Sequence, residues 1–368
     1  MPPRPTPLAQ SLPASVPFVG PETQERARGR AFVARLGANE SVFGPSPDAI
    51  AAMAAAASEV WMYGDPEVHD LRAALARHHD VAPENIVVGE GIDGLLGYLV
   101  RLMIAPGDNV VTSDGAYPTF NFHVTGYGGH LHKAPYRDDH EDPDALLKLA
   151  RNTRAKLIYL ANPDNPMGTW HTAARLEAMV TDLPPDCLLI LDEAYIDLAP
   201  PGTAPAIPAD QPQAIRLRTF SKGYGMAGLR VGYGIAAPEW VSAFNKVRNH
   251  FGVGRIAQAG ALTALADQPY LTAVAVRVAQ ARDSIAAIGR ANGLIPLPSA
   301  TNFVALDCGA DGMFAARVLT KLVDQGIFIR KPFVSPQDRC IRISAGTPAD
   351  LAALAKALPL ALRKAHAE

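Results

Sequence analysis

Cysteine is scarce in this sequence, and long apolar runs are absent from it. The three cysteines among the 368 residues, Cys187, Cys308 and Cys340, are far apart and odd in number, so neither a disulfide framework nor a Cys-x-x-Cys metal pair is indicated. No segment approaches the ~20 consecutive apolar residues that span a bilayer, and the proline-rich beginning of the chain holds no apolar run of signal-peptide length. These absences predict a protein of the reducing cytoplasm.

An excess of charge of either sign is also missing. The formal net charge is −2 and charged residues make up 19% of the chain, so the composition gives no argument for nucleic acid or an anionic membrane as a partner. The hydrophobic share of 48% is ordinary for a soluble enzyme. The length suggests roughly two domains with a substantial core. We therefore expect the partners to be small molecules.

Three familiar catalytic signatures are missing as well. The chain contains no Gly-x-x-x-x-Gly-Lys-[Ser/Thr], so the acidic strand end Leu-Leu-Ile-Leu-Asp-Glu at 188–193 is not that of a nucleotide hydrolase. No Gly-x-Ser-x-Gly elbow occurs either. The histidines at 78–80 (His-His-Asp) and 130–132 (His-Leu-His) come without a carboxylate or cysteine at ligand spacing. We predict no metal site.

Strand and helix patterns alternate along most of the chain. Residues 1 to about 30 are rich in proline, which cannot continue a helix, and are expected to form an extended arm. Apolar strands and amphipathic helices then alternate to about residue 236, the pattern of a parallel sheet with crossover helices. Residues 255–291 are alanine-rich and helical in period, with one break at 267–269. The predicted units are the N-terminal arm and the segment leading into the small domain at 1–44, a large α/β domain at 45–270, and a small α+β domain at 271–368.

Short apolar runs bounded by turn formers predict the strands. In the small domain, two such runs are separated by a helical pattern, which is typical of an α+β unit. The expected strands are 85–88, 109–113, 156–160, 187–191, 214–218 and 230–235 in the large domain and 302–306 and 340–344 in the small one.

A glycine-rich turn follows the first of these strands. Gly89-x-Gly91-x-x-Gly94 opens a helix, and Asp114 lies 20 residues after Gly94 at the end of a strand. This arrangement matches a dinucleotide fingerprint and predicts, as one alternative, an NAD-dependent dehydrogenase. However, a glycine turn at a helix N-terminus binds any phosphate, through free N–H groups and the helix dipole. The same turn therefore also suits the phosphate of another cofactor.

The segment 219–234 carries the most informative pattern. Lys222 follows two hydroxyl residues, Thr219 and Ser221, and Arg230 lies eight residues further on. Five glycines between 223 and 234 permit tight turns and close approach of a bound group. Hydroxyls and a guanidinium suit phosphate oxygens, and an amine held beside them suits a Schiff base with a carbonyl cofactor or substrate. A glycine-rich surface loop with two solvated cations is the structural alternative.

This pattern resembles a known enzyme family. Thr-x-Ser-Lys with an arginine eight residues on resembles the lysine segment of fold-type I aminotransferases, which use pyridoxal 5′-phosphate (PLP). Ser-Lys-x-x-x-x-Ala-Gly-Leu-Arg-x-Gly-Tyr is similar to the histidinol-phosphate aminotransferase-like branch of class I/II. The resemblance implies an aspartate aminotransferase-like α/β fold, with a mostly parallel seven-stranded sheet flanked by helices in a large PLP-binding domain, plus a smaller α+β domain. It further implies that Lys222 forms the internal aldimine and shuttles the substrate proton, while Ser221 and Arg230 hold the cofactor phosphate.

Further motifs extend the resemblance to the pyridine ring. Asp192 ends a buried strand, where α/β sheets face their ligand crevice, and a carboxylate there can keep the ring nitrogen protonated. Asp-Glu-Ala-Tyr at 192–195 resembles the family motif in which the aspartate makes this ion pair and the tyrosine, here Tyr195, approaches the phenolic oxygen. Asn-Pro-Asp-Asn-Pro-Met-Gly at 162–168 is similar to Asn-Pro-Asn-Asn-Pro-Thr-Gly, whose second amide, here Asn165, donates to that oxygen. Tyr117 stands where relatives stack an aromatic ring on the pyridine face.

The resemblance also implies a phosphate cup and a second subunit. Ile92 replaces a serine common in relatives, so it can offer only its backbone N–H. Tyr63, in Tyr-Gly-Asp-Pro, resembles a tyrosine that reaches across a dimer interface to the partner's cofactor phosphate, and we therefore expect a homodimer. The cup is expected to consist of Gly91, Ile92, Asp93, Thr219, Ser221 and Arg230.

Two arginines and an asparagine are the candidates for substrate binding. Arg330 and Arg342 resemble the family arginines that bind a carboxylate or a phosphate. Arg342 alternates with Ile341 and Ile343 on a strand, so it should point away from their face. Asn39 lies in a segment similar to the family's Leu-x-x-Asn-Glu.

Two departures from the family leave the substrate open. By the same resemblance, Phe18 replaces a tyrosine that helps to bind the substrate phosphate in histidinol-phosphate enzymes, and His250 changes the usual Arg-x-Pro-Phe-Asn-Val. We predict a PLP-dependent aminotransferase that moves an amino group between an amino acid or amino phosphate and a 2-oxo acid. The alternatives are a PLP-dependent decarboxylase or racemase, a PLP-binding regulatory protein, and the dehydrogenase.

Overall fold

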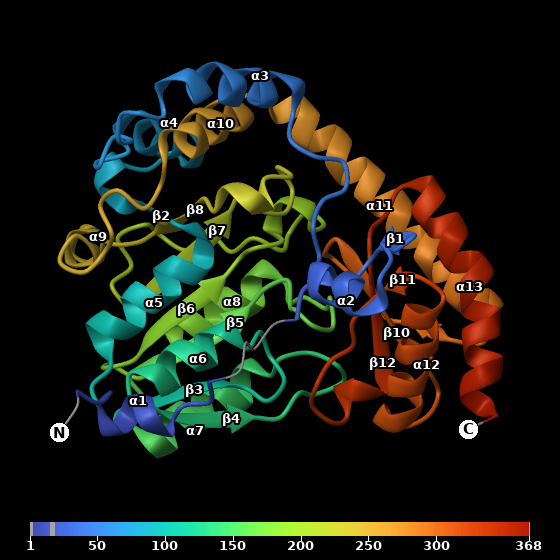
Figure 1. Ribbon diagram of the computed structural model, residues 1–368. Coiled ribbons are helices and arrows are strands. Elements are labelled where there is room, and N and C mark those ends of the chain that lie inside the picture. Colours follow the sequence, from blue (N-terminus) through green and yellow to red (C-terminus); the bar gives the residue numbers. More distant parts are fainter. Residues whose placement is uncertain (1–2, 15–18, 368) are drawn as a thin grey trace.

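A seven-stranded sheet is the largest element of the computed structural model, which describes residues 3–14 and 19–367 (Figure 1). The strand order is β2-β8-β7-β6-β5-β3-β4. Neighbours from β7 to β4 pair in parallel, whereas β8 is antiparallel to both β7 and β2. The predicted mostly parallel seven-stranded sheet is therefore confirmed. Its strands are β2 (Ile86–Gly89), β3 (Asn109–Ser113), β4 (His130–Ala134), β5 (Leu157–Ala161), β6 (Leu188–Asp192), β7 (Ala214–Thr219) and β8 (Gly232–Ile235).

Helices cover both faces of this sheet, which explains why its central strands are continuous apolar runs. Val110 and Ile190 pack in one core with α5, α6 and α9, while Val111 and Leu189 pack in another with α7 and α8. A third core joins β2 and β8 to α3, α4 and α10. These helices are α3 (Pro47–Ala56), α4 (His69–His79), α5 (Gly91–Met103), α6 (Thr119–Gly126), α7 (Pro143–Thr153), α8 (Ala173–Thr181), α9 (Pro238–Phe244) and α10 (Arg255–Ala266).

A smaller α+β unit lies beside the large sheet (Figure 1). It has a three-stranded antiparallel sheet, β12-β10-β9, and a parallel pair, β1 with β11, which share one apolar core with three helices. Helix α11 runs without a break through residues 270 and 271, where the sequence predicts the boundary between the large and the small domain. This boundary stays a prediction. The elements are β1 (Ala34–Arg35), β9 (Ile295–Pro296), β10 (Phe303–Asp307), β11 (Ile327–Phe328), β12 (Cys340–Ser344), α11 (Gln268–Ala291), α12 (Gly312–Asp324) and α13 (Pro348–His366).

The N-terminal arm differs from the expected extended chain. It contains two short helices, α1 (Pro7–Ser11) and α2 (Pro21–Arg28), each of which begins with proline. The expectation was wrong for these stretches because proline is well tolerated at the first helical position, where its missing N–H would have no partner. Phe18 lies outside the described residues. No helix in the described part of the chain has both the length and the apolar character needed to cross a lipid bilayer.

Candidate active site

A cavity of about 360 Å³ lies at the carboxyl ends of β5, β6 and β7, where the small unit faces the large sheet. This volume is within the range of roughly 300–1,000 Å³ that is typical of small-molecule sites. Parallel strands end at the same edge of a sheet, which is why residues far apart in sequence meet here. The predicted site residues that line the cavity are Asn39, Ile92, Asp93, Tyr117, Asn165, Asp192, Tyr195, Thr219, Ser221, Lys222, Arg230, Arg330 and Arg342.

One end of the cavity is built for an anion. Arg230 Nη1 lies 3.5 Å from Ser221 Oγ, which itself accepts from Thr219 Oγ1 at 3.0 Å. Helix α5 begins here at Gly91 without a side-chain cap, so its first N–H groups are free. Gly91 has a φ of +74°, and a Cβ there would lie 2.6 Å from the Arg230 guanidinium. The predicted phosphate-cup residues therefore surround one anion site, the anion cradle. A side chain at position 91 would crowd the Arg230 guanidinium there.

Lys222 lies in the middle of the cavity. Its Nζ donates to the Asn39 carbonyl at 2.9 Å and lies 5.5 Å from the centre of the Tyr195 ring. Burial lowers the pKa of Lys222 to about 8, and the nearby Arg342 guanidinium acts in the same direction. The neutral amine, which is the nucleophilic form, is therefore more abundant near neutral pH than in a lysine with the ordinary pKa.

Asp192 faces the cavity from the end of β6. Its Oδ2 accepts from Tyr159 Oη at 2.6 Å, and its Oδ1 accepts from the Ala194 backbone N–H at 3.0 Å. Burial raises the pKa of Asp192 to about 6, although both hydrogen bonds oppose this shift. Tyr159 is not among the predicted site residues, because a tyrosine inside an apolar strand cannot be distinguished from a core residue by its pattern.

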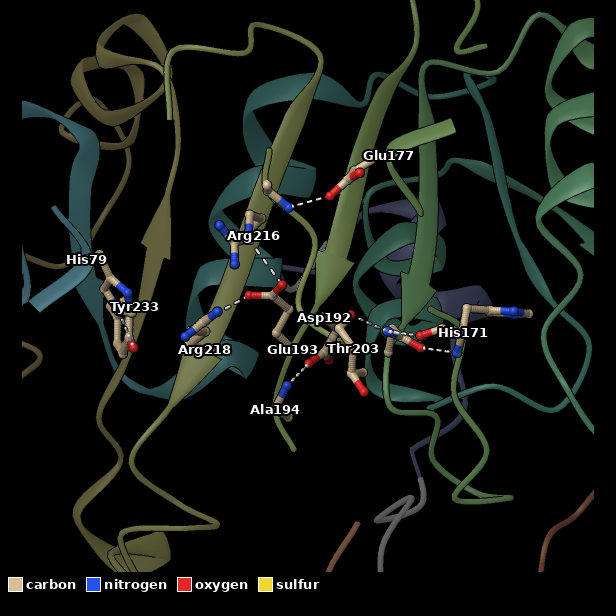
Figure 2. Close-up of polar contacts among 12 residues, drawn as sticks. His79, His171, Glu177, Asp192, Glu193, Ala194, Thr203, Arg216, Arg218 and Tyr233 are labelled. Atoms are coloured by element: carbon tan, nitrogen blue, oxygen red, sulfur yellow. Dashed lines mark hydrogen bonds and ion pairs between the residues drawn. The ribbon is translucent and has the colours of Figure 1, made fainter. Parts of the chain in front are cut away.

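Glu193, the next residue, does not line the cavity and belongs to a buried ion cluster (Figure 2). It accepts from Arg216 Nε at 3.1 Å and from Arg218 Nε at 2.7 Å, and its side chain is fully buried. Burial alone would raise the pKa of Glu193, but the two guanidinium groups outweigh it and hold the pKa below its ordinary value. The cluster joins the end of β6 to β7, the strand that leads to Lys222. In the sequence, two arginines alternating on a buried strand are the signal that could have indicated this ion cluster.

The small unit contributes two guanidinium groups to the cavity lining. Arg330 and Arg342 pair through their backbones in an isolated β-bridge. Arg342 Nη1 donates to Asn165 Oδ1, whereas Ile341 and Ile343 are buried in the small core, as their alternation predicts. Arg330 Nη2 donates to the Val19 carbonyl at 2.8 Å. Glu40, Lys331 and Phe333, which the sequence analysis did not single out, also line the cavity.

Comparison with known proteins identifies the family. Residues 33–358 match the family model for aminotransferase class I and II. The chain belongs to this family.

Relatives of this class I/II aminotransferase include histidinol-phosphate aminotransferases. That of Anaeromyxobacter sp. is 38% identical over 328 residues, covering 88% of this chain and 89% of the relative. The crystal structure of the Sinorhizobium meliloti histidinol-phosphate aminotransferase in complex with PLP has a TM-score of 0.95 and 53% identity, with 98% of each chain covered. A single mutant of the Thermus thermophilus aspartate aminotransferase, 22% identical with a TM-score of 0.81 over 98% of this chain and 100% of that one, shares the fold. The protein is thus a fold-type I transaminase with PLP as its cofactor, and the dehydrogenase is not favoured.

The cavity of this aminotransferase fits PLP. The anion cradle beside Gly91 suits the phosphate, the Lys222 amine suits the carbonyl, and the buried Asp192 carboxylate suits a protonated ring nitrogen. Tyr117, which is half-buried at the cavity wall, offers a flat ring. The donor set therefore matches each polar group of the cofactor.

Other predicted features lie away from the cavity. Tyr63 is 78% exposed and contacts Phe251 with its ring tilted, with 4.8 Å between ring centres. His79 bonds Tyr233 Oη at 2.8 Å inside the protein (Figure 2), and Asp114 forms an ion pair with Lys133 at 3.1 Å. Within residues 3–14 and 19–367, no cluster of three or more histidine, cysteine or acidic residues is arranged to hold a metal.

Proposed function

We propose that this transaminase acts on histidinol phosphate, with a 2-oxo acid as the acceptor. The observation that carries the proposal is the pair Arg330 and Arg342, which brings two guanidinium groups of the small unit to the cavity lining, in addition to Arg230 of the large domain. Both have donors to offer a ligand: Arg342 Nε is buried with no hydrogen-bond partner among the described residues, and the Arg330 guanidinium uses Nη2 for the Val19 carbonyl. A phosphate dianion uses two guanidinium groups better than a single carboxylate does. The names of the relatives agree with this substrate.

PLP, when bound, supplies a ring that withdraws electrons from the carbon attached to the amino group. Thr219, Ser221, Arg230 and the first N–H groups of α5 bind its phosphate. Asp192 would offer its carboxylate to the protonated ring nitrogen, and Tyr159 keeps that carboxylate in place. The polar side chains thus fix the cofactor at both ends of its ring.

Lys222 moves the proton of the reaction. Its Nζ would attach to the cofactor carbonyl. Once displaced by the substrate amine, it would take the proton from the substrate carbon that bears the nitrogen and return it to the cofactor carbon on the other side of that nitrogen. The lowered pKa makes the free amine available as the base near neutral pH. Asn165 uses its Oδ1 for Arg342, so its Nδ2 hydrogens remain for the phenolic oxygen of PLP.

We also propose a cytoplasmic homodimer in which Tyr63 of each subunit reaches the other's phosphate cup. Its support is a surface of large apolar side chains, with Val60 59%, Trp61 80% and Phe251 51% exposed beside Tyr63. A surface of this kind is typical of a subunit interface.

Purified holoenzyme incubated with histidinol phosphate and 2-oxoglutarate should form glutamate. Histidinol, which lacks the phosphate, is the matched control substrate and should show a KM about 10²-fold higher, because it loses the charge-assisted bonds to both arginines. Arg330→Ala and Arg342→Ala should remove this preference for the phosphate. Turnover of an aromatic amino acid with none of histidinol phosphate would contradict the proposed substrate. Release of carbon dioxide from that amino acid, without formation of glutamate, would indicate a decarboxylase.

A further inference from the structure

Ser344 lies behind the cavity wall and binds Asn39 twice. The Asn39 backbone N–H donates to Ser344 Oγ at 3.0 Å, and Ser344 Oγ donates to Asn39 Oδ1 at 2.9 Å. On its other side, Asn39 Nδ2 donates to Tyr195 Oη at 3.1 Å. The exposed fractions of Ser344, Asn39 and Tyr195 are 3%, 3% and 4%, so water does not compete for these bonds.

The donor and the acceptor of each hydrogen bond between Ser344, Asn39 and Tyr195 are fixed. A backbone N–H can only donate, so Ser344 Oγ must accept from Asn39 and has one hydrogen left to give. Among the described residues, Asn39 Oδ1 is the acceptor that this hydrogen reaches. If the Asn39 amide were flipped, the buried Ser344 hydrogen would have no acceptor, which is costly. Ser344 therefore keeps the amide oxygen on its own side and the amide nitrogen facing Tyr195.

This orientation decides what Tyr195 does with its hydrogen. Tyr195 Oη accepts from Asn39 Nδ2, so its own hydrogen stays free to be donated into the cavity. We propose that Ser344 is a positioning residue, which orients the Asn39 amide so that the Tyr195 hydroxyl donates to the phenolic oxygen of PLP. The inference rests on the proposed contact between Tyr195 and PLP.

The backbone of Asn39 adds to the rigidity of this arrangement. Its φ is +55°, in the left-handed region that asparagine tolerates better than most residues. Its carbonyl accepts from Lys222 Nζ at 2.9 Å and from Asn302 Nδ2 at 3.0 Å. A substitution of Asn39 would therefore disturb the backbone, the lysine and the tyrosine together. Ser344 is the residue that tests the orientation alone.

The test is the pH titration of the visible absorbance of the holoenzyme. A hydrogen bond to the phenolic oxygen of PLP stabilises negative charge there, and this favours loss of the proton shared by that oxygen and Lys222 Nζ. In Ser344→Ala the Asn39 amide can flip and take the Tyr195 hydrogen, so the titration midpoint should rise by about 0.5 to 1 pH unit. The charged groups that face Lys222, which are Arg342, Glu40, Arg230 and Asp192, remain unchanged in this variant.

Three comparisons make the result decisive. Tyr195→Phe should raise the midpoint at least as far, and no shift in that variant would refute the proposed role of Tyr195 itself. Ser344→Thr keeps the hydroxyl and should restore the wild-type midpoint. Ser299→Ala removes another hydroxyl of the small unit, one that bonds Thr301 and Phe303, and should leave the midpoint unchanged.

A shift in Tyr195→Phe with none in Ser344→Ala overturns the inference. Should Ser344→Ala not fold, Ser344→Cys preserves the volume with a weakly donating thiol, and its midpoint should move in the same direction by less. An unchanged titration midpoint in Ser344→Cys would likewise contradict the positioning role of Ser344.

Discussion

Tyr159 donates its phenolic hydrogen to Asp192 across 2.6 Å, from one strand of the sheet to its neighbour. The bond holds the carboxylate in its charged form, against the burial that raises its pKa to about 6. Tyr159→Phe should therefore lower kcat roughly tenfold, because a hydrogen bond to a charged group contributes about 1.5–3 kcal/mol and 1.4 kcal/mol corresponds to tenfold in rate. Steady-state transamination assays at saturating PLP measure this loss.

The control for this prediction is Tyr136→Phe. Tyr136 also donates to a buried carboxylate, that of Asp164 at 2.9 Å, but Asp164 does not line the cavity. Its removal should affect stability more than kcat. Equal losses of kcat in the two variants would mean that the Tyr159 bond has no special part in catalysis.

The lowered pKa of Lys222 predicts how fast the cofactor-free protein takes up PLP. Covalent attachment needs the neutral amine, so its rate should rise with pH to about 8 and then level off, whereas Nα-acetyl-lysine should react faster up to its ordinary value near 10.5. Stopped-flow absorbance between pH 6 and 11 follows both reactions. A protein rate that keeps rising above pH 9 would contradict the effect of burial.

The same pKa predicts a change in stability. Between pH 8 and 10.5 the folded cofactor-free protein binds fewer protons at Lys222 than the unfolded chain does. The contribution of this site to the free energy of unfolding should therefore increase as the pH rises through that window. Urea unfolding of the cofactor-free protein and of Lys222→Met should show the difference, because the variant lacks the titrating group.

The buried cluster around Glu193 should contribute strongly to stability. Glu193→Gln leaves the Arg216 and Arg218 guanidinium groups without their carboxylate, and loss of one partner from a buried ion pair typically costs about 3–5 kcal/mol. Asp144→Asn is the matched control, since Asp144 pairs with Arg175 at 2.6 Å on the surface, where such pairs contribute about 1 kcal/mol or less. Urea unfolding of the holoenzyme measures both. Similar losses in the free energy of unfolding in the two variants would show that burial does not strengthen the ion pairs of Glu193.

Local pattern was enough to predict much of the fold. Strands β3 and β12 coincide with the predicted runs 109–113 and 340–344, because both are apolar stretches bounded by turn formers. The site residues that line the cavity follow strand ends or family motifs, and strand ends converge on one edge. The edge strand β4 escaped prediction because three of its five residues, His130, His132 and Lys133, are polar and face outward or lie half-buried.

The supporting residues could not be predicted for a different reason. Tyr159 contacts Asp192 only because β5 and β6 pair in one register, and Ser344 meets Asn39 across 305 positions of sequence. Neither residue departs from the pattern of a buried strand. Their roles depend on which segments pair and pack together in the folded protein, and this cannot be read from a single sequence.

Tyr63 should act on the partner's active site rather than on its own. Tyr63→Phe removes one charge-assisted hydrogen bond to the PLP phosphate, so the Kd for PLP should rise roughly 10- to 100-fold. Hybrid dimers distinguish the two possibilities. A dimer of one Lys222→Ala subunit and one Tyr63→Phe subunit keeps one site with both native residues only if Tyr63 acts across the interface. Its single Lys222 site should therefore bind PLP with wild-type affinity, as measured by visible absorbance.

The reciprocal hybrid is the control for this experiment. A subunit that carries both Lys222→Ala and Tyr63→Phe, paired with a wild-type subunit, has one native lysine whose cup receives phenylalanine from the partner. This hybrid should bind PLP with the weakened affinity of Tyr63→Phe. If the two hybrids exchange these affinities, Tyr63 serves its own subunit. A monomer in light scattering at assay concentrations would contradict the shared site altogether, because the 78% exposed tyrosine contacts Phe251 outside the cavity of its own subunit.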